Sequence, residues 1–299
     1  MRRLIGGAAF IFAMLAASWA YAAGLGQAEP WQIGFQQSAT PIMDRITSLH
    51  NFILWIIVIV TLFVMILLIM VMVKFNARAN PEPSKTTHNT FIEVLWTVVP
   101  ILILLVMAVP SFRLLYFQRD FPQIDMTIKA IGNQWYWSYE YPDNNDISFD
   151  SIMLEGDELE ERRKVDPGAP RLLAVDNEIV VPVNKAVRVI VTASDVLHNF
   201  AMPSFGTKMD AVPGRLNETW FKAQKEGIFY GQCSELCGIR HAYMPIAIRV
   251  VSQEKFDAWV SAAADDIDAA QQQLLATVAD EKKKLAKKKQ PVDVAAASE

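Results

Sequence analysis

The sequence predicts two membrane-spanning helices followed by an external all-β domain. Two apolar stretches near the N-terminus are long enough to cross a membrane, and from Asp125 onward apolar residues recur at every second position, as in β-strands. Hydrophobic residues make up 52% of the 299 positions and charged residues 20%, but the apolar ones are concentrated in the first part of the chain. The formal net charge of −4 argues against a nucleic-acid-binding protein.

Residues 1–23 have the features of a secretory signal peptide. Arg2-Arg3 is a basic start, Leu4–Ala17 is a short apolar stretch, and Ala20-Tyr21-Ala22 offers small residues at a cleavage position. A first membrane helix is the alternative, but the apolar stretch is short for a span. Cleavage would leave residues 24–50 as an N-terminal segment outside the cytoplasmic membrane.

Residues 51–117 are expected to form a transmembrane helical hairpin. Phe52–Val73 has no charged residue and is long enough for a first span, and Val94–Phe112 is the second. The short loop between them is basic and should stay in the cytoplasm; it contains Lys74, Arg78 and Lys85. Because two spans return the chain to the side where it began, everything after about Phe117 is expected on the periplasmic side of a bacterial inner membrane.

Residues 118–262 are expected to form the all-β domain, a sandwich or a barrel, because many short strands follow one another between turn signals. The predicted strands are 126–131, 134–141, 147–153, 171–175, 178–183, 186–193, 227–232 and 245–251. Ser252–Ala262 is expected to be a helix with Ser252 as its cap. Residues 263–299, rich in alanine and lysine, are expected to be a disordered tail.

Metal-ligating side chains are concentrated in one segment of the predicted β-domain. Cys233, Cys237, His241 and Met244 place two thiols, an imidazole and a thioether in a short loop, which is the soft ligand set that copper prefers. His198 follows a predicted strand and supplies a second imidazole. One copper ion needs a single thiolate, whereas two thiolates at this spacing can bridge two copper ions. Such a pair leaves no open position for a substrate, which favours electron transfer over bond-making chemistry.

Two other interpretations of these residues remain open. In an oxidising compartment Cys233 and Cys237 can pair as a disulfide, and cysteine with histidine can also bind zinc. Zinc has little use for Met244, and a disulfide has no use for the histidines or for Met244. The residue types therefore favour copper. The chain contains no Cys-x-x-Cys-His segment, so no attached c-type haem is expected.

The metal-ligating loop and four other segments resemble the cytochrome c oxidase subunit II family. The similar segments are Cys233–Met244, which matches that family's CuA loop, Asp195–His198, Lys208–Arg215, Gln134–Trp137 and Asn89–Pro100. The resemblance runs in order from about His50 to Trp259. It implies a cupredoxin-like β-domain behind two helices, in a proton-pumping oxidase whose subunit I carries the haems. Its implied partners are cytochrome c, subunit I and subunit III.

The resemblance also implies a role for individual residues. The implied ligands of a binuclear CuA centre are His198, Cys233, Cys237, His241, Met244 and the backbone carbonyl of Glu235. The Glu235 side chain is expected to face a magnesium or manganese ion shared with subunit I. Trp135 is expected to receive electrons from cytochrome c, and Glu93 to lie at the entrance of a proton pathway. The implied docking residues for cytochrome c are Glu140, Asp150, Asp176 and Asp195.

Each of these roles has a plainer alternative. Trp135 shares its parity with Trp137, Tyr139 and Tyr141, so it can belong to a core stripe. Glu93 can close a helix start through the capping box that begins at Thr90. Glu235 and the four docking carboxylates can be ordinary surface charges. In favour of docking, positions 120–260 carry 21 Asp and Glu against 14 Lys and Arg, a difference of −7 that would attract a basic partner.

Three other protein classes compete with this interpretation. A quinol oxidase subunit II is a related membrane protein without the copper ligands, all of which are present here. A membrane-tethered structural module would use the cysteines only as a disulfide. A nitrous oxide reductase has a similar copper domain but is not built on two N-terminal spans. The complete ligand set and the two spans together favour the oxidase subunit.

Overall fold

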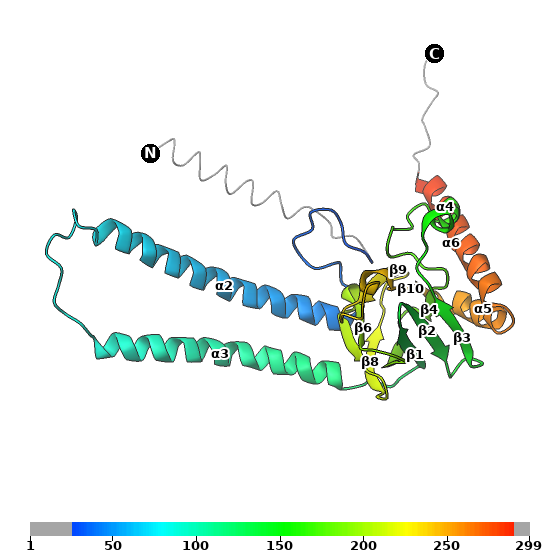
Figure 1. Ribbon diagram of the computed structural model, residues 1–299, viewed down its shortest axis with the longest axis horizontal. Helices are drawn as coiled ribbons and strands as arrows, with labels where there is room; N and C mark the ends of the chain where they lie inside the picture. Colours follow the sequence, from blue (N-terminus) through cyan, green and yellow to red (C-terminus); the bar gives the residue numbers. More distant parts are fainter. Residues whose placement is uncertain (1–25, 290–299) are drawn as a thin grey trace, which may run out of the picture. The chain divides into compact units, whose positions relative to one another are not determined.

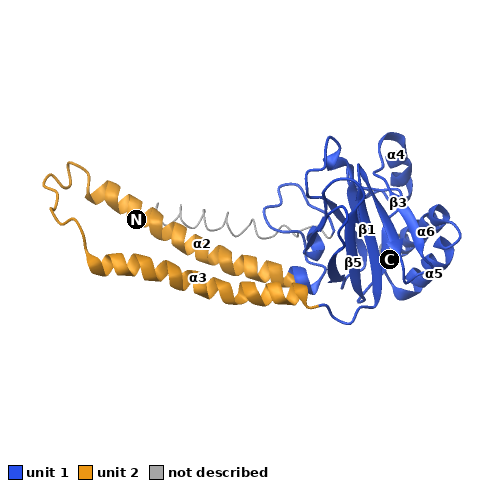
Figure 2. Ribbon diagram, turned by 60° about the horizontal axis from the view of Figure 1, so that its bottom comes forward, with its two compact units in different colours: residues 1–43, 121–299 blue, residues 44–120 orange. Residues whose placement is uncertain are grey.

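The computed structural model describes residues 26–289, so the predicted signal peptide lies outside the described part of the chain. The chain divides into two compact units, coloured separately in Figure 2. One unit is Asp44–Asp120, and the other combines the chain up to Met43 with Phe121–Glu299. The first is helical, and the second contains all the β-strands among the described residues.

The helical unit is a pair of long helices, α2 (Pro41–Lys74) and α3 (Thr90–Arg119), which run the length of the hairpin in Figure 1. The two predicted spans lie inside them. Both helices are long and apolar enough to cross a membrane, and neither buries its apolar stretch inside the protein. Helices that are apolar on all sides are stable when lipid surrounds them. Asn89 caps the start of α3, and its side chain accepts a hydrogen bond from the backbone N–H of Ile92 at 3.2 Å.

The β-domain is a sandwich of two five-stranded sheets. The first sheet has the strand order β3-β2-β1-β5-β8 and the second β4-β10-β9-β6-β7. The strands of the first sheet are β1 (Met126–Asn133), β2 (Tyr136–Tyr141), β3 (Ile147–Ser151), β5 (Ala186–Ala193) and β8 (Asn217–Lys222). Those of the second are β4 (Ile179–Pro182), β6 (His198–Met202), β7 (Thr207–Ala211), β9 (Gly227–Cys233) and β10 (Pro245–Val251). Only β1 with β5 and β4 with β10 pair in parallel among these strands.

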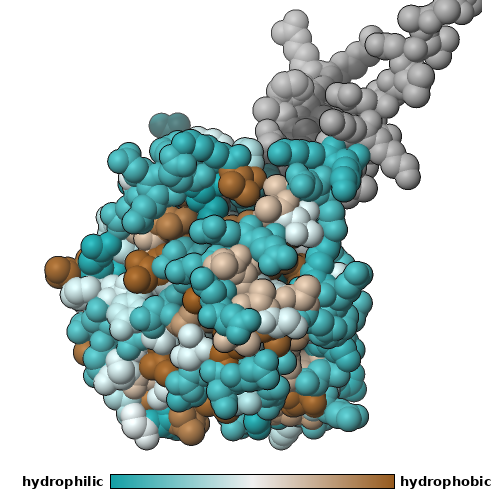
Figure 3. Space-filling view, turned by 90° about the vertical axis from the view of Figure 1, so that its right-hand side faces the viewer, coloured by the Kyte–Doolittle hydropathy of each residue, from teal (hydrophilic) through white to brown (hydrophobic). Residues whose placement is uncertain are grey.

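Aromatic residues from both sheets fill the space between them. Trp137, Tyr139 and Tyr141 are fully buried on one face of β2, while Phe200 and Phe229 come from the second sheet. The strict alternation of buried and less buried residues along β2 follows from the period of two in a strand. The predicted fold class, two membrane helices and an all-β domain, is confirmed. On the face shown in Figure 3 the domain is mainly hydrophilic, as expected of a domain in water.

Several local predictions were wrong. Residues 171–175 form turns instead of a strand, with Leu172 at a φ of 69° and only Val175 pairing, through a single bridge to Met153. Helix α4 (Gly156–Val165) was missed, although acidic residues in its first turn and basic residues in its last favour a helix. The strands β6, β7 and β8 were missed as well; β6 is buried at every position, so it shows no alternation.

The C-terminal region corrects a second expectation. Helix α5 (Gln253–Ala263) begins at Ser252 as predicted, and the serine oxygen accepts a hydrogen bond from Lys255 N. The stretch expected to be a disordered tail instead contains helix α6 (Ile267–Lys289). Its buried residues Ala270 and Leu274 lie one helical turn apart and join the main core, which explains why this segment is ordered. The short 3-10 helices η2 (Pro203–Phe205) and η3 (His241–Tyr243) complete the fold.

Candidate metal centre

Two neighbouring strands of the second sheet bring the predicted ligands together. His198 is the first residue of β6 and is fully buried. Cys233 is the last residue of β9, and β6 pairs with β9 so that Phe200 lies opposite Cys233. The loop after Cys233 returns through η3 to β10, which pairs with the other side of β9. The sheet therefore places the metal loop beside the start of β6.

All six predicted copper-ligand groups converge where this loop meets the start of β6. The Sγ atoms of Cys233 and Cys237 are 3.9 Å apart. Cys233 Sγ lies 3.9 Å from His198 Nδ1 and 3.3 Å from the Glu235 carbonyl oxygen. Cys237 Sγ lies 3.5 Å from His241 Nδ1 and 3.5 Å from Met244 Sδ. Each thiol thus has one imidazole nitrogen and one weaker donor at its side.

This donor set fits copper better than the alternatives. Both cysteines are free thiols in the structure, so it contains no disulfide here. The site offers four strong donors, which are two thiols and two imidazoles, and two weak ones, a thioether and a backbone carbonyl. Six donors exceed the four ligands of a structural zinc site. Thiolate, imidazole and thioether together are the set of ligands that copper prefers. Within residues 26–289, His198, Cys233 and Cys237 are the one cluster of three such residues whose ligand atoms lie within 4.8 Å of one another.

Asp195 holds His198 in the orientation that a metal site needs. Its carboxylate lies 2.9 Å from His198 Nε2 and accepts hydrogen bonds from the backbone N–H groups of Gln134 at 2.7 Å and Val196 at 2.6 Å. A proton on Nε2 that is donated to Asp195 leaves Nδ1 unprotonated on the thiol side. Burial opposes ionisation of Asp195, but the bonds from His198 and the two backbone groups outweigh it and lower the pKa of its carboxyl.

Gly132 and Trp137 also shape the site, and the sequence offered no signal for the role of Gly132. A Cβ atom on Gly132 would lie 2.8 Å from both Cγ and Cδ2 of His198, so only glycine leaves room for the imidazole. Trp137 donates from Nε1 to the Met244 carbonyl at 3.2 Å, and its ring meets the His198 ring edge-on at 6.0 Å. The buried core stripe is confirmed for Trp137, Tyr139 and Tyr141.

Trp135 differs from that stripe because it precedes β2 and is only half-buried. Its indole Nε1 donates a hydrogen bond to the Cys237 carbonyl oxygen at 3.2 Å, and the Gln134 side-chain amide donates to the same oxygen at 2.8 Å. The indole thus lies at the rim of the domain in direct contact with the metal loop. That position is compatible with the predicted entry of electrons, which stays a prediction.

The four predicted docking carboxylates do not share one environment. Glu140 forms an ion pair with Lys129 at 3.0 Å, and Asp150 accepts a 2.6 Å hydrogen bond from the Ser138 hydroxyl, both on the outer side of the first sheet. Asp195 is engaged with His198, as described above. For all four residues, docking stays a prediction.

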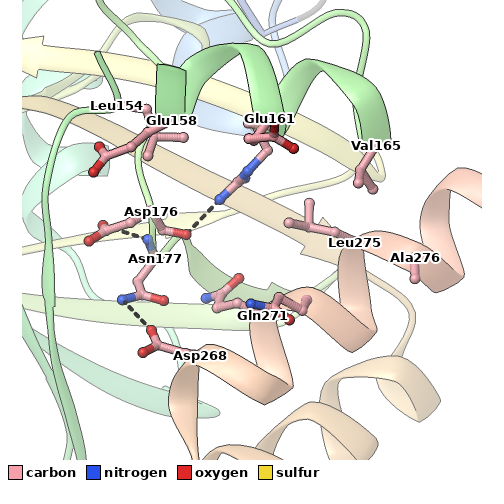
Figure 4. A pocket seen from close by; sticks show the side chains of 12 residues that line it. Leu154, Glu158, Glu161, Val165, Asp176, Asn177, Asp268, Gln271, Leu275 and Ala276 are labelled. Carbon is pink, nitrogen blue, oxygen red and sulfur yellow. Dashed lines mark hydrogen bonds between the residues drawn. The ribbon is translucent and has the colours of Figure 1, made fainter. Parts of the chain in front are cut away.

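Asp176 lies in a pocket of about 460 Å³ that α4 and α6 line (Figure 4). Its carboxylate accepts hydrogen bonds from Ile152 N at 2.7 Å and Asn177 N at 2.6 Å. Burial is the main cause that raises the pKa of this carboxyl. None of the predicted copper ligands lines this pocket, so Asp176 has a local role in the fold that is separate from the metal site.

The two remaining predicted residues, Glu93 and Glu235, lie in different units. The Glu235 side chain is exposed in the metal loop while its carbonyl points at Cys233. Glu93 lies in the first turn of α3, but the cap of that helix is Asn89, so the capping box expected from Thr90 is wrong. The predicted binding of a magnesium or manganese ion by Glu235 and the predicted place of Glu93 in a proton pathway stay predictions.

We expect the two thiols of the reduced, copper-free protein to lose their protons at widely separated pH values. Burial raises the pKa of Cys233, but hydrogen bonds with His198 and with the backbone of Glu235 outweigh it and lower that pKa to about 7. Burial and the neighbouring Cys233 raise the pKa of Cys237 to about 12. The thiolate absorbance should therefore rise by one equivalent near neutral pH and by the second only in strong alkali. Cys237→Ser should retain the first step, and two thiols titrating together near their ordinary value would contradict the expectation.

Comparisons with known proteins agree with this arrangement. Residues 126–251 match the family described as cytochrome c oxidase subunit II, periplasmic domain, and residues 28–114 match its transmembrane domain. The probable cytochrome c oxidase subunit 2 of Rickettsia bellii (strain RML369-C) is 54% identical over 233 residues, which cover 78% of this chain and 84% of the relative. The cytochrome c oxidase subunit 2 of Oenothera berteroana is 49% identical over 241 residues, which cover 78% and 91%.

A solved structure is similar as well. The crystal structure of the periplasmic domain of subunit II of the cytochrome oxidase of Bradyrhizobium japonicum is 59% identical, covers 50% of this chain and 99% of its own, and has a TM-score of 0.45. The two family matches and the relatives at about half identity span both the helical unit and the β-domain. The chain therefore belongs to the cytochrome c oxidase subunit II family, as a membrane component of an oxidase complex with two transmembrane helices and a β-domain of two sheets.

Proposed function

We propose that this chain holds a binuclear CuA centre and passes electrons through it from cytochrome c to the haem- and copper-containing subunit I of a proton-pumping oxidase. The convergence of two thiols, two imidazoles, a thioether and a backbone carbonyl on one loop carries the proposal. The bound copper pair would supply a one-electron carrier, and the ligands of the chain occupy its coordination positions. The ligand set is His198, Cys233, Glu235 through its carbonyl, Cys237, His241 and Met244.

The protein part of this function is to keep the ligands in place during electron transfer. His198, Cys233, Cys237 and Met244 are buried, which keeps water away from the ligand atoms. Asp195 holds the His198 ring through Nε2, and Trp137 holds the Met244 backbone through its carbonyl oxygen. Ligands fixed by their neighbours move little when the charge of a site changes, and this lowers the cost of each electron transfer.

We place the β-domain on the periplasmic side of the bacterial inner membrane, after removal of residues 1–23. The domains would then be an external segment at 24–50, the hairpin at 51–117 and the copper domain at 118–262. In the complex with subunits I and III, the Glu235 carboxylate would bind a magnesium or manganese ion shared with subunit I. Glu93 would lie at the cytoplasmic entrance of a proton pathway.

Replacing Trp135 with phenylalanine should slow electron entry from cytochrome c without changing the copper site. The indole donates a hydrogen bond to the Cys237 carbonyl, and phenylalanine has no such donor. We expect the rate of copper reduction by cytochrome c in stopped-flow measurements to fall about tenfold or more, with an unchanged copper spectrum. Trp31→Phe, at a tryptophan that is 98% exposed, is the matched control. Equal rates for Trp135→Phe and the native chain would remove Trp135 from the electron path.

Reversing the charges of Glu140 and Asp150 should weaken the encounter with cytochrome c in a salt-dependent way. Both lie on the outer side of the first sheet, so lysine there adds charge without disturbing the core. We expect the bimolecular rate to fall several-fold at low ionic strength and the difference to vanish near 1 M salt, where the screening length is about 3 Å. Asp257→Lys on α5 is the control for each single reversal, because it changes the net charge by the same amount. A slowing that persists at high salt would point to damage of the site instead of lost attraction.

The proposed function is tested by loading the full chain with copper and measuring copper per protein and the electron paramagnetic resonance spectrum. Two coppers that share one unpaired electron, seen as a multi-line hyperfine pattern, are expected. One copper with a four-line pattern would mean a mononuclear site. Failure of the reduced protein to take up copper, with Cys233 and Cys237 returning to a disulfide, would mean that the cysteines serve only the fold.

A further inference from the structure

One end of the helical unit contains a cationic groove to which the proposed function assigns no role. It lies between the first turns of α2 and the last turns of α3 and has a volume of about 450 Å³. Its lining residues are Arg45, Ser48, Leu49, Phe52, Pro110, Arg113 and Leu114. The lining thus combines two guanidinium groups and one hydroxyl with apolar side chains, and it contains no carboxylate.

The two arginines are available to bind an anion. The guanidinium carbon of Arg45 lies 3.5 Å from the centroid of the Phe117 ring, so a side chain of α2 is fixed against α3. A guanidinium stacked on a ring keeps its N–H groups, which lie in its plane, free for other partners. Arg113 is exposed, and neither arginine takes part in any ion pair formed by the described residues.

The other charges at this end do not neutralise the groove. Asp44 and Asp120 are exposed and lie outside the groove lining, and Arg119 in the last turn of α3 adds a further positive charge. Arg45 precedes the apolar stretch of α2 and Arg113 follows that of α3. Arginines that flank a membrane span lie at the depth of the lipid headgroups.

We propose that this groove binds the headgroup of an anionic phospholipid, with its phosphodiester between the guanidinium groups of Arg45 and Arg113. Planar guanidinium groups bind phosphate oxygens through paired hydrogen bonds. The apolar side chains of Leu49, Phe52 and Leu114 line the same groove and offer contacts for the start of an acyl chain. A zwitterionic headgroup would place an ammonium group beside two arginines and find no carboxylate in the lining, so the site selects phosphatidylglycerol over phosphatidylcholine.

The test is lipid retention by the full chain, extracted from its membrane with the proteins bound to it and placed in nanodiscs of equal phosphatidylglycerol and phosphatidylcholine. After transfer to detergent, we expect mass spectrometry to find one retained phosphatidylglycerol per chain. R45Q and R113Q should each lower its retention about fivefold, and the double variant by the product. R119Q, which removes an arginine at the same end but outside the groove, should retain the lipid as the native chain does.

Four results would overturn the proposal. Equal retention of the two lipids would remove the headgroup selectivity, and loss in R119Q as large as in R113Q would mean a general effect of charge. Retention only by the isolated chain, and not by the assembled complex, would mean that another subunit occupies the groove. Inorganic phosphate at millimolar concentration should not displace the lipid. If it does, and the retained lipids show no preference for a headgroup, the groove is a site for free phosphate.

Discussion

Replacing Gly132 with alanine is expected to abolish normal copper binding while the sandwich stays folded. The added Cβ would lie 2.8 Å from two ring atoms of His198 and 2.9 Å from its Cβ, closer than a carbon atom can approach. His198 has no room to move away, because it is fully buried, bound to Asp195 through Nε2 and packed against Trp137. The added methyl group must therefore force the imidazole and strand β1 apart and disturb the position of His198, at a cost of about 1–3 kcal/mol in folding free energy.

The measurement compares copper content, paramagnetic resonance and thermal unfolding in the same preparations. Gly132→Ala should bind less than one copper pair per chain or give an altered hyperfine pattern, with the circular dichroism of the native sandwich. Gly34→Ala is the matched control, because a Cβ at Gly34 would meet no atom within 4 Å. A native copper spectrum in Gly132→Ala would show that His198 is not held against β1 as the structure has it.

Replacing Glu178 with alanine is expected to destabilise the β-domain more than any surface substitution. The Glu178 side chain is 3% exposed and accepts hydrogen bonds from Arg249, also 3% exposed, and from Arg162 at 3.1 Å. Its oxygens form two contacts with the Arg249 guanidinium, one of them at 2.9 Å. Without Glu178, the nearest remaining ion-pair partner of the buried guanidinium is Asp166 at 3.8 Å.

Removing one partner of a buried ion pair costs about 3–5 kcal/mol, because the other charge stays buried without compensation. For a domain of this size, such a loss lowers the unfolding temperature by about 10 °C. Thermal unfolding of the full chain in detergent would measure it. Glu161→Ala removes the exposed pair with Lys164 and should change the free energy of unfolding by less than about 1 kcal/mol.

A double variant shows whether the effect comes from the uncompensated charge. Replacing Glu178 with leucine and Arg249 with methionine together removes both charges and keeps apolar volume, so it should recover most of the stability lost in Glu178→Ala. If the double variant is as unstable as the single one, the loss comes from packing of the surrounding residues. If Glu178→Ala unfolds at the native temperature, the ion pair contributes nothing to the fold.

The features that the sequence determined are those encoded by neighbouring residues. Both membrane spans follow from uninterrupted apolar stretches inside α2 and α3. The buried stripe of β2 follows from alternation, and five of the six predicted copper ligands lie in one short loop. Each of these patterns lies within one short stretch of the chain, where helix and strand geometry relate neighbouring residues directly.

Other features depended on contacts between distant parts of the chain. Strand β6 is buried on both faces and so has no alternation, although it carries His198. The lysines in the last turns of α6 concealed its short apolar stripe, which packs against the main core. Asp195 was predicted as a docking charge, which stays a prediction, but its contact with His198 was not foreseen, and Gly132 had no sequence signal at all.

The tertiary structure alone decided how the metal site is supported. Gly132, Trp137 and Asp195 come from β1, β2 and the segment before β6, and they meet at His198 only because the two sheets pack face to face. The ligand types could be recognised in the sequence because copper selects donor atoms by their chemistry. The residues around the ligands could not be recognised in this way. They are selected by the space and the hydrogen-bonding positions beside the His198 imidazole, which exist only once the two sheets have packed.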